Sequence, residues 1–115
     1  MNRTFRLTKS ADFKKVKETG KVYFHPLVKM AVCPNGLPHS RFAVVTSKLI
    51  GNAVVRNRCR RRLRAILNQK KDRCQTGWDI VFIVRKRFIH SNASEIQAAI
   101  ESLFLQARLV NKKIN

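Results

Sequence analysis

Acidic residues are scarce in this sequence. Six Asp and Glu stand against 25 Lys and Arg in 115 residues, which gives a formal net charge of +19. No acidic residue occurs between Glu18 and Asp72, although basic residues are frequent in that stretch. Because self-repulsion at such a charge destabilises a compact fold, the composition indicates a polyanionic partner, either nucleic acid or an anionic membrane surface.

Cysteines and long apolar runs are also few. The three cysteines, Cys33, Cys59 and Cys74, are odd in number and include no C-x-x-C pair. This pattern excludes a zinc ribbon and a disulfide framework, and it indicates reduced thiols. No apolar run is long enough for a transmembrane helix, and the N-terminus lacks the apolar segment of a signal peptide. We therefore expect a single domain over residues 1–115, located in the cytoplasm.

The sequence also lacks residues arranged for protein-based catalysis. A metal-dependent nuclease needs clustered carboxylates, but the acidic residues are scattered along the chain. The histidines fall in predicted loops or at strand edges, where nothing positions them as general acid and base. Neither a Walker loop nor a G-x-G-x-x-G motif is present. We predict no catalytic and no metal-binding residue among the acids and histidines: Asp12, Glu18, Asp72, Asp79, Glu95, Glu101, His25, His39 and His90.

The chain does contain a regular series of helix and strand patterns. Apolar residues at helical spacing predict three helices, and alternating or continuous apolar runs predict the strands between them. A possible break at His25-Pro26 divides the first strand region in two. The predicted fold is an α/β two-layer sandwich with about four strands in the order α-β-β-(β)-α-β-α. The predicted helices span about residues 10–19, 52–69 and 92–110, and the strand regions are 22–33, 41–47 and 78–84.

The segment GNAVVRNRCRRRLRAIL, residues 51–67, is the most informative part of the sequence. Its pattern predicts a helix with a narrow apolar face on the sheet and a basic opposite face. Like charges three and four residues apart destabilise a helix, so such a face indicates an anionic partner, and arginine favours bidentate recognition of phosphate. The apolar face comprises Val55, Cys59, Leu63 and Ile66, and the opposite face comprises Asn57, Arg60, Arg61 and Arg64.

RNA is the preferred partner for this helix. An interfacial membrane helix needs a broad apolar face of large residues, whereas this face is narrow, contains Cys59 and is needed by the core. A helix-turn-helix reader of DNA needs a preceding helix and a short turn, and a predicted strand occupies that place instead. We therefore favour RNA over a membrane or DNA.

The same segment resembles the signature of the bacterial ribonuclease P protein family. The resemblance rests on Lys48, Gly51, Ala53-Val54 and the run from Arg56-Asn57-Arg58 to Arg64. It extends to the N-terminal helix, through Arg6-Leu7, Asp12-Phe13, Val16 and Gly20, and so spans essentially the whole chain. The resemblance implies an unusual left-handed βαβ crossover, although right-handed crossovers are the general rule. It also implies a subunit that assists a catalytic RNA in removing 5′ leaders from precursor tRNA.

The resemblance further implies two binding surfaces and a magnesium-dependent reaction. The catalytic RNA supplies the active site and holds the Mg²⁺ ions, and the protein alone is inactive and requires no further protein partner. In this chain Lys17 stands where many members carry a second aromatic, which implies a leader site that depends more on charge. The implied RNA-subunit-binding residues are Lys48, Asn52, Arg56, Asn57, Arg58, Arg60, Arg61 and Arg64, and the leader-binding residues are Phe13, Lys14, Lys17 and Met30.

Three alternatives remain open at this point. Phe13 is a core residue of the first helix, a base-stacking platform, or both, with one ring face covered and the other open. Tyr23 and Phe24 are adjacent in a predicted strand and point to opposite faces of the sheet, so only one of them can line the implied leader-binding cleft. A small structural RNA-binding protein of ribosomal type accounts for the charge and size, although not for the signature in residues 51–64.

Overall fold

The computed structural model describes residues 3–110. Three α-helices, four strands and four short 3-10 turns follow one another along the chain. The helices are α1 (Ser10–Thr19), α2 (Ala53–Lys70) and α3 (Ala93–Gln106), and the strands are β1 (Lys21–Phe24), β2 (Val28–Pro34), β3 (Arg41–Val45) and β4 (Trp78–Val84). The 3-10 turns are η1 (Arg3–Phe5), η2 (Lys48–Ile50), η3 (Lys71–Arg73) and η4 (Lys86–His90). No helix in residues 3–110 is long and apolar enough to cross a membrane.

The four strands form one mixed sheet in the order β1-β2-β4-β3. The β1–β2 and β2–β4 pairs are antiparallel, and β3 and β4 are parallel. The expected α/β fold with four strands and three helices is confirmed, and the chain breaks between β1 and β2 around His25 and Pro26, as the proline predicts. Helix α2 connects the parallel pair β3 and β4, and the left-handedness of that crossover stays a prediction.

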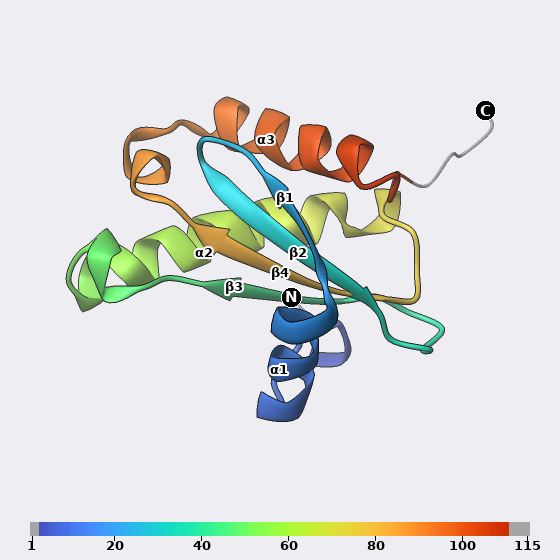
Figure 1. Cartoon of the computed structure of the whole chain (residues 1–115). Helices are drawn as coiled ribbons and strands as arrows, with labels where there is room; N and C mark the ends of the chain where they lie inside the picture. The colour runs from blue at the N-terminus through green and yellow to red at the C-terminus, as the bar shows by residue number, and fades with distance from the viewer. Residues whose placement is uncertain (1–2, 111–115) are drawn as a thin grey trace.

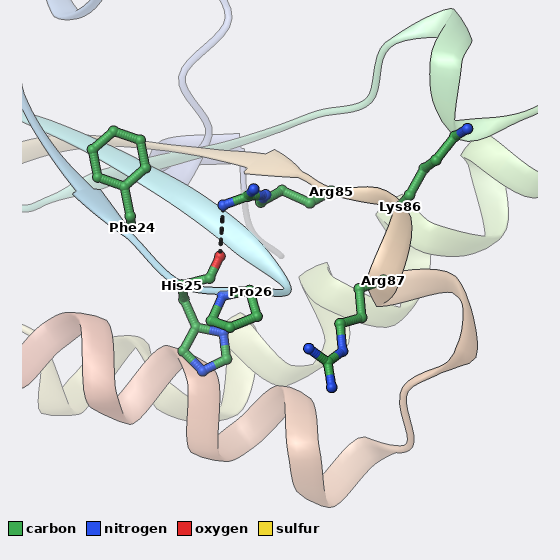
Figure 2. A pocket seen from close by; sticks show the side chains of 6 residues that line it. All are labelled: Phe24, His25, Pro26, Arg85, Lys86 and Arg87. Carbon is green, nitrogen blue, oxygen red and sulfur yellow. Dashed lines mark hydrogen bonds between the residues drawn. The ribbon is translucent and has the colours of Figure 1, made fainter.

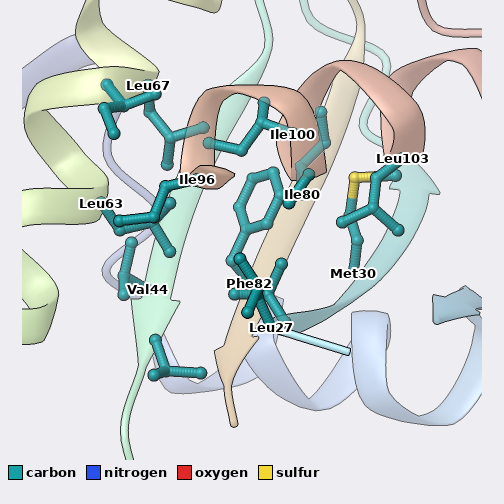
Figure 3. Packing of buried hydrophobic residues seen from close by; sticks show 14 of the residues in the cluster. Leu27, Met30, Val44, Leu63, Leu67, Ile80, Phe82, Ile96, Ile100 and Leu103 are labelled. Carbon is teal, nitrogen blue, oxygen red and sulfur yellow. The ribbon is translucent and has the colours of Figure 1, made fainter. Parts of the chain in front are cut away.

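Helices cover the two faces of the sheet unequally (Figure 1). Helices α2 and α3 lie together on one face, over the larger apolar cluster, which includes Phe82 and Leu63 (Figure 3). Helix α1 crosses the other face alone, over a smaller cluster around Val16 and Val81. A ten-residue helix covers only part of that face, and the uncovered part is available for function.

Local sequence signals explain the boundaries of the two long helices. Asn52 caps α2 by accepting a hydrogen bond of 3.0 Å from the Val55 N–H. Asn92 and Glu95 form the predicted capping box at α3, each side chain accepting from the backbone N–H of the other. Both helices bury an apolar stripe, and their solvent-facing sides carry the polar residues.

Candidate nucleic-acid interface

The entry into α2 depends on a glycine and a buried anchor. Gly51 has φ 153° and ψ −164°, a backbone conformation that is open almost only to glycine. A Cβ at Gly51 would lie 3.1 Å from the Cβ of Val55, so the turn is also tight. Ile50 is buried just before it and fixes η2 to the core, while Lys48 in the same turn stays exposed. This geometry places Lys48 just before the first turn of α2.

We name the basic side of α2, together with its N-cap residue and Lys48 of the preceding η2, the α2 surface. Its residues are Lys48, Asn52, Arg56, Asn57, Arg58, Arg60, Arg61 and Arg64. Arg58 and Arg61 are exposed. Arg60 is half-buried and donates hydrogen bonds to the Thr46 hydroxyl at 2.7 Å and to the Asn57 side chain. Within residues 3–110 no α2 arginine forms an ion pair with a carboxylate. The α2 surface therefore presents uncompensated positive charge from a rigid helix.

Arg62 differs from the other arginines of α2. Its guanidinium donates to the Ser91 carbonyl oxygen and lies 5.6 Å from the centre of the Phe88 ring. These contacts connect α2 to η4 and to Ser91, the residue that follows η4. Arg62 therefore has a role in packing, and it lies outside the residues that the sequence assigns to RNA-subunit binding.

Arg6 lies next to the α2 surface, although it is distant from α2 in sequence and is not among the predicted RNA-binding residues. Arg6 and Arg64 line a small pocket of about 120 Å³ between the N-terminal segment, β3 and α2. Burial lowers the pKa of Arg64, and the positive charges of Arg6 and Arg60 lower it further. The Leu7 N–H donates to the Phe42 carbonyl at 2.9 Å and fixes this segment beside β3. Converging guanidinium groups of this kind form a site for a phosphate group.

A groove lies on the opposite face of the sheet, beside α1. Its volume is about 540 Å³. Two cross-strand rows form its floor, one through Val22, Ala31 and Val81 and the other through Lys29, Ile83 and Val45. The side chain of Ala31 is small, so this part of the floor lies low between α1 and the sheet. The groove is lined by Phe13, Lys14, Val16, Lys17, Val22, Lys29, Ala31, Val45, Val81 and Ile83.

Helix α1 supplies one wall of this groove. Phe13 packs against the smaller apolar cluster and also lines the groove, and its side chain is half-buried. Its core role is therefore present, and its role as a base-stacking platform stays a prediction. Lys14 and Lys17 are exposed along the same wall, and Lys14 lies 4.0 Å from Glu18. The structure therefore brings together three of the four residues assigned to leader binding.

The assignment of Met30 to leader binding is wrong. Met30 is 0% exposed and belongs to the larger cluster with Leu103 of α3, on the opposite face of the sheet from the groove. Figure 3 draws it among those core residues. Side chains alternate along a strand, so Lys29 and Ala31, the neighbours of Met30 in β2, are the residues that face the groove. Lys29 is therefore a groove residue that the sequence-based prediction did not include, although the alternation of this strand could have indicated it.

An ion-pair network anchors α1 to the sheet. Arg41 of β3 donates two hydrogen bonds to the Asp79 carboxylate, at 2.8 and 2.7 Å, and its third nitrogen lies 3.3 Å from the carboxylate of Asp12 in α1. Hydrogen bonding to Asp79 raises the pKa of Arg41. At the other end of α1, a Cβ on Gly20 would lie 2.2 Å from the Val16 carbonyl oxygen and 3.1 Å from the Val32 carbonyl oxygen of β2, so the end of the helix passes close to the sheet. Both ends of α1 are thereby fixed over the groove.

The acidic side chains of the chain are mostly engaged in structural contacts. Asp12 and Asp79 pair with Arg41, Glu101 pairs with Lys70, and Glu95 caps α3. The hydrogen bond from Lys70 lowers the pKa of Glu101. Within residues 3–110 no three side chains of His, Cys, Asp or Glu gather in a way that could hold a metal ion.

The groove opens at one end onto a second basic hollow. Lys29 and Ile83 line both the groove and this hollow, where Phe24, Arg85 and Lys86 join them. Figure 2 shows the Phe24 ring on one side of the β1–β2 end and the His25 ring on the other, toward α3. Burial and the charge of Arg87 lower the pKa of His25, whose Nδ1 accepts a hydrogen bond from the Leu27 N–H at 3.1 Å.

The choice between Tyr23 and Phe24 is resolved by the burial of each ring. Tyr23 packs against the larger cluster and carries Lys21 at 5.6 Å from its ring centre. Phe24 lies opposite Lys29 in the sheet register and is exposed on the groove face. Phe24 is therefore the aromatic residue of β1 that reaches the groove face.

A basic helix on one face of the sheet and a groove with an aromatic and several lysines on the other define an RNA-binding α/β protein. The family model for Ribonuclease P matches residues 1–108, and this chain belongs to the ribonuclease P protein family. It is 38% identical to the ribonuclease P protein component of Herpetosiphon aurantiacus over 95% of this chain and 89% of the relative. It is 36% identical to that of Dehalococcoides mccartyi strain CBDB1, over 97% and 92%.

Solved structures agree with this family. The RNase P protein of Staphylococcus aureus matches with a TM-score of 0.83 and 28% identity, over 93% of this chain and 98% of that chain. The RNase P protein of Thermotoga maritima matches with a TM-score of 0.80 and 25% identity, over 92% and 98%. The chain is thus the protein component of a ribonuclease P, and the ribosomal-type alternative is not favoured.

Proposed function

We propose that this chain binds the catalytic RNA of ribonuclease P through the α2 surface and holds the single-stranded 5′ leader of precursor tRNA in the groove beside α1. The RNA subunit supplies the active site and holds the Mg²⁺ ions of the reaction. The protein acts by binding and positioning the substrate, and it performs no chemical step of its own.

The placement of two different surfaces on opposite faces of the sheet is the observation that carries this proposal. The α2 surface is rich in arginine, which suits the phosphates of a folded RNA. The groove combines the Phe13 ring with Lys17 and Lys29, which suits the bases and phosphates of a single strand. A small protein with both surfaces can contact the RNA subunit and the leader at the same time.

The engagement of the acidic residues supports assigning catalysis to the RNA. A two-metal nuclease site requires carboxylates that converge on ions held about 4 Å apart. Here Asp12 and Asp79 converge instead on the guanidinium of Arg41. The excess positive charge of the protein offsets the repulsion between two RNA molecules and so lowers the magnesium concentration that the RNA requires.

A leader-length series tests the proposal. We expect Phe13→Ala in the reconstituted holoenzyme to weaken binding of precursor tRNA with a long leader by about 1–3 kcal/mol, the usual contribution of one base stack. Binding of a leaderless tRNA should not change. Leu105→Ala is the control, because Leu105 is an exposed apolar residue of α3, on the other face of the sheet.

Two results would contradict the leader site. One is an equal loss of affinity for long-leader and leaderless substrates. The other is full leader affinity in Phe13→Leu, a variant that keeps the apolar packing of α1 but removes the aromatic ring.

A further inference from the structure

Phe24 is an exposed aromatic side chain that does not belong to either apolar cluster of residues 3–110. It is 62% exposed and is the one aromatic among the exposed large apolar side chains of residues 3–110. Over the same residues its ring takes part in no ring–ring and no cation–ring contact, whereas Phe5, Tyr23 and Phe88 each have at least one. A single exposed apolar residue is ordinary at a protein surface, so the surroundings of the Phe24 ring decide whether it has a binding role.

The sheet register places Phe24 on the face that carries the groove. Phe24 lies directly opposite Lys29, and Lys29 lies opposite Ile83 in the next strand. Residues paired in this way point to the same side of a sheet. Val45 completes this row, and Lys29, Ile83 and Val45 are all floor residues of the groove. The Phe24 ring therefore continues the groove floor to the outer edge strand.

The surroundings of Phe24 are cationic. It lines a hollow of about 620 Å³ with Lys29, Arg85 and Lys86, and none of the residues that line this hollow is acidic. The hollow and the groove share Lys29 and Ile83, so the two are continuous. Figure 2 shows the Arg85 side chain extended toward the end of the β1–β2 connection, where it donates to the His25 carbonyl at 3.3 Å. An exposed ring beside fixed cations suits a nucleotide, with a face for the base and charge for the phosphate.

We propose that Phe24 is a second base-stacking platform for the single-stranded leader, at the far end of the groove from Phe13. This inference rests on the proposed function of the groove. Helix α1 offers a single aromatic, Phe13, with Lys17 one turn further along the same wall. Phe24 supplies from β1 the second ring that α1 lacks. The leader then lies over the Lys29–Ile83 row between the two rings.

Substitutions at Phe24 in the reconstituted holoenzyme test the stacking directly. We expect Phe24→Ala and Phe24→Leu to weaken binding of long-leader precursor tRNA by about 5- to 150-fold, the range for loss of one base–aromatic stack. Phe24→Trp should retain or increase affinity, because a larger ring stacks at least as well. The salt dependence of binding should be unchanged in all three variants, whereas Lys29→Gln should reduce it. Exposed Leu105 again provides the matched apolar control, as Leu105→Ala.

Fluorescence locates the stacked base. 2-Aminopurine placed at successive leader positions should be quenched at two positions in the wild-type complex, one for each ring, and Phe24→Leu should restore its emission at one of these positions alone. Restoration by Phe13→Leu should occur at a different position.

Failure of this inference is distinguishable from failure of the proposed function. Loss of leader affinity in Phe13→Ala with wild-type affinity in Phe24→Leu would overturn the role of Phe24 and leave the groove as the leader site. An equal effect of Phe24→Ala on leaderless tRNA, or on assembly with the RNA subunit, would also overturn it. No leader-dependent change in either Phe13→Ala or Phe24→Ala would contradict the leader site itself.

Discussion

At the scale of single residues, the groove combines side chains whose contacts with RNA differ in their sensitivity to salt. Stacking on Phe13 is nearly insensitive to ionic strength, whereas a lysine contact to phosphate weakens as salt rises. Lys17 lies on the groove wall one helical turn from Phe13. The leader affinity of this chain should therefore contain a separable electrostatic part.

Substitution of Lys17 isolates that part. We expect Lys17→Gln to reduce the slope of log affinity against log salt for long-leader precursor tRNA by about one unit, with assembly of the holoenzyme unchanged. The control is Lys15→Gln, which removes the same charge from the same helix at a position that does not line the groove. Equal slopes for the two variants would place the leader away from this wall of the groove.

The sequence determines which residues share a strand face, but it does not determine their partners in neighbouring strands. The alternation of β2 separates Met30 from Lys29 and Ala31, so the resemblance assigned to the leader site a residue that points to the opposite face of the sheet. The pairing of Arg41 with Asp79 depends on the register of β3 against β4, in which these two residues lie opposite each other. A contact over such a sequence distance has no local signal.

At the scale of elements, few contacts hold α1 over the groove. Helix α1 contributes one fully buried side chain, Val16, and the half-buried Phe13. The Asp12–Arg41 pair and the close passage at Gly20 hold its two ends. The position of Phe13 therefore depends on an ion pair one residue away.

Removal of the Asp12 charge separates positioning from electrostatic attraction. Asp12→Asn makes the protein more positive, which by charge alone should tighten RNA binding. We expect the opposite for long leaders, a loss of about 1 kcal/mol, because α1 is no longer fixed over the groove. Glu18→Gln makes the same charge change on the same helix and should not weaken binding. Tighter leader binding by Asp12→Asn would show that the ion pair has no positioning role.

The helices themselves follow closely from the sequence. The structure confirms the predicted first helix at residues 10–19, and it shifts the predicted second helix by one residue, to residues 53–70. Apolar periodicity and the side-chain caps at Asn52 and Asn92 are local signals, which is why they were readable. Ser10 is of a type that often caps helices, but it is the first helical residue of α1, and Lys9 precedes it without a side-chain cap.

At the scale of the whole molecule, charge and topology together set how the protein meets RNA. The face that α1 covers, and the strand order that places β4 between β2 and β3, arise from long-range pairing and could not be predicted from local patterns. The net charge of +19, in contrast, is a property of composition alone. It predicts strong electrostatic binding before any fold is known.

Assembly with the RNA subunit should therefore depend steeply on salt. If the α2 surface contacts six to ten phosphates, affinity should fall roughly 10³- to 10⁵-fold between about 50 and 200 mM monovalent salt. Arg58→Gln should weaken assembly and reduce the slope by about one unit, since Arg58 is exposed and has no carboxylate partner within residues 3–110. Equilibrium binding across a salt series measures both. A flat slope would contradict an RNA partner for α2.

The three buried cysteine thiols can report on local opening of the fold through their rates of chemical labelling. Cys33 lies in the cluster beneath α1, whereas Cys59 and Cys74 belong to the cluster beneath α2 and α3. Burial raises the pKa of Cys59, and it raises that of Cys74 to about 12, so neither reacts as a thiolate while it stays enclosed. An alkylating reagent therefore modifies each sulfur at the rate at which the layer above it opens. Comparing the labelling rate of Cys33 with the rates of Cys59 and Cys74 shows, without any engineered probe, which face of the sheet opens first: the face covered by α1 or the face covered by α2 and α3.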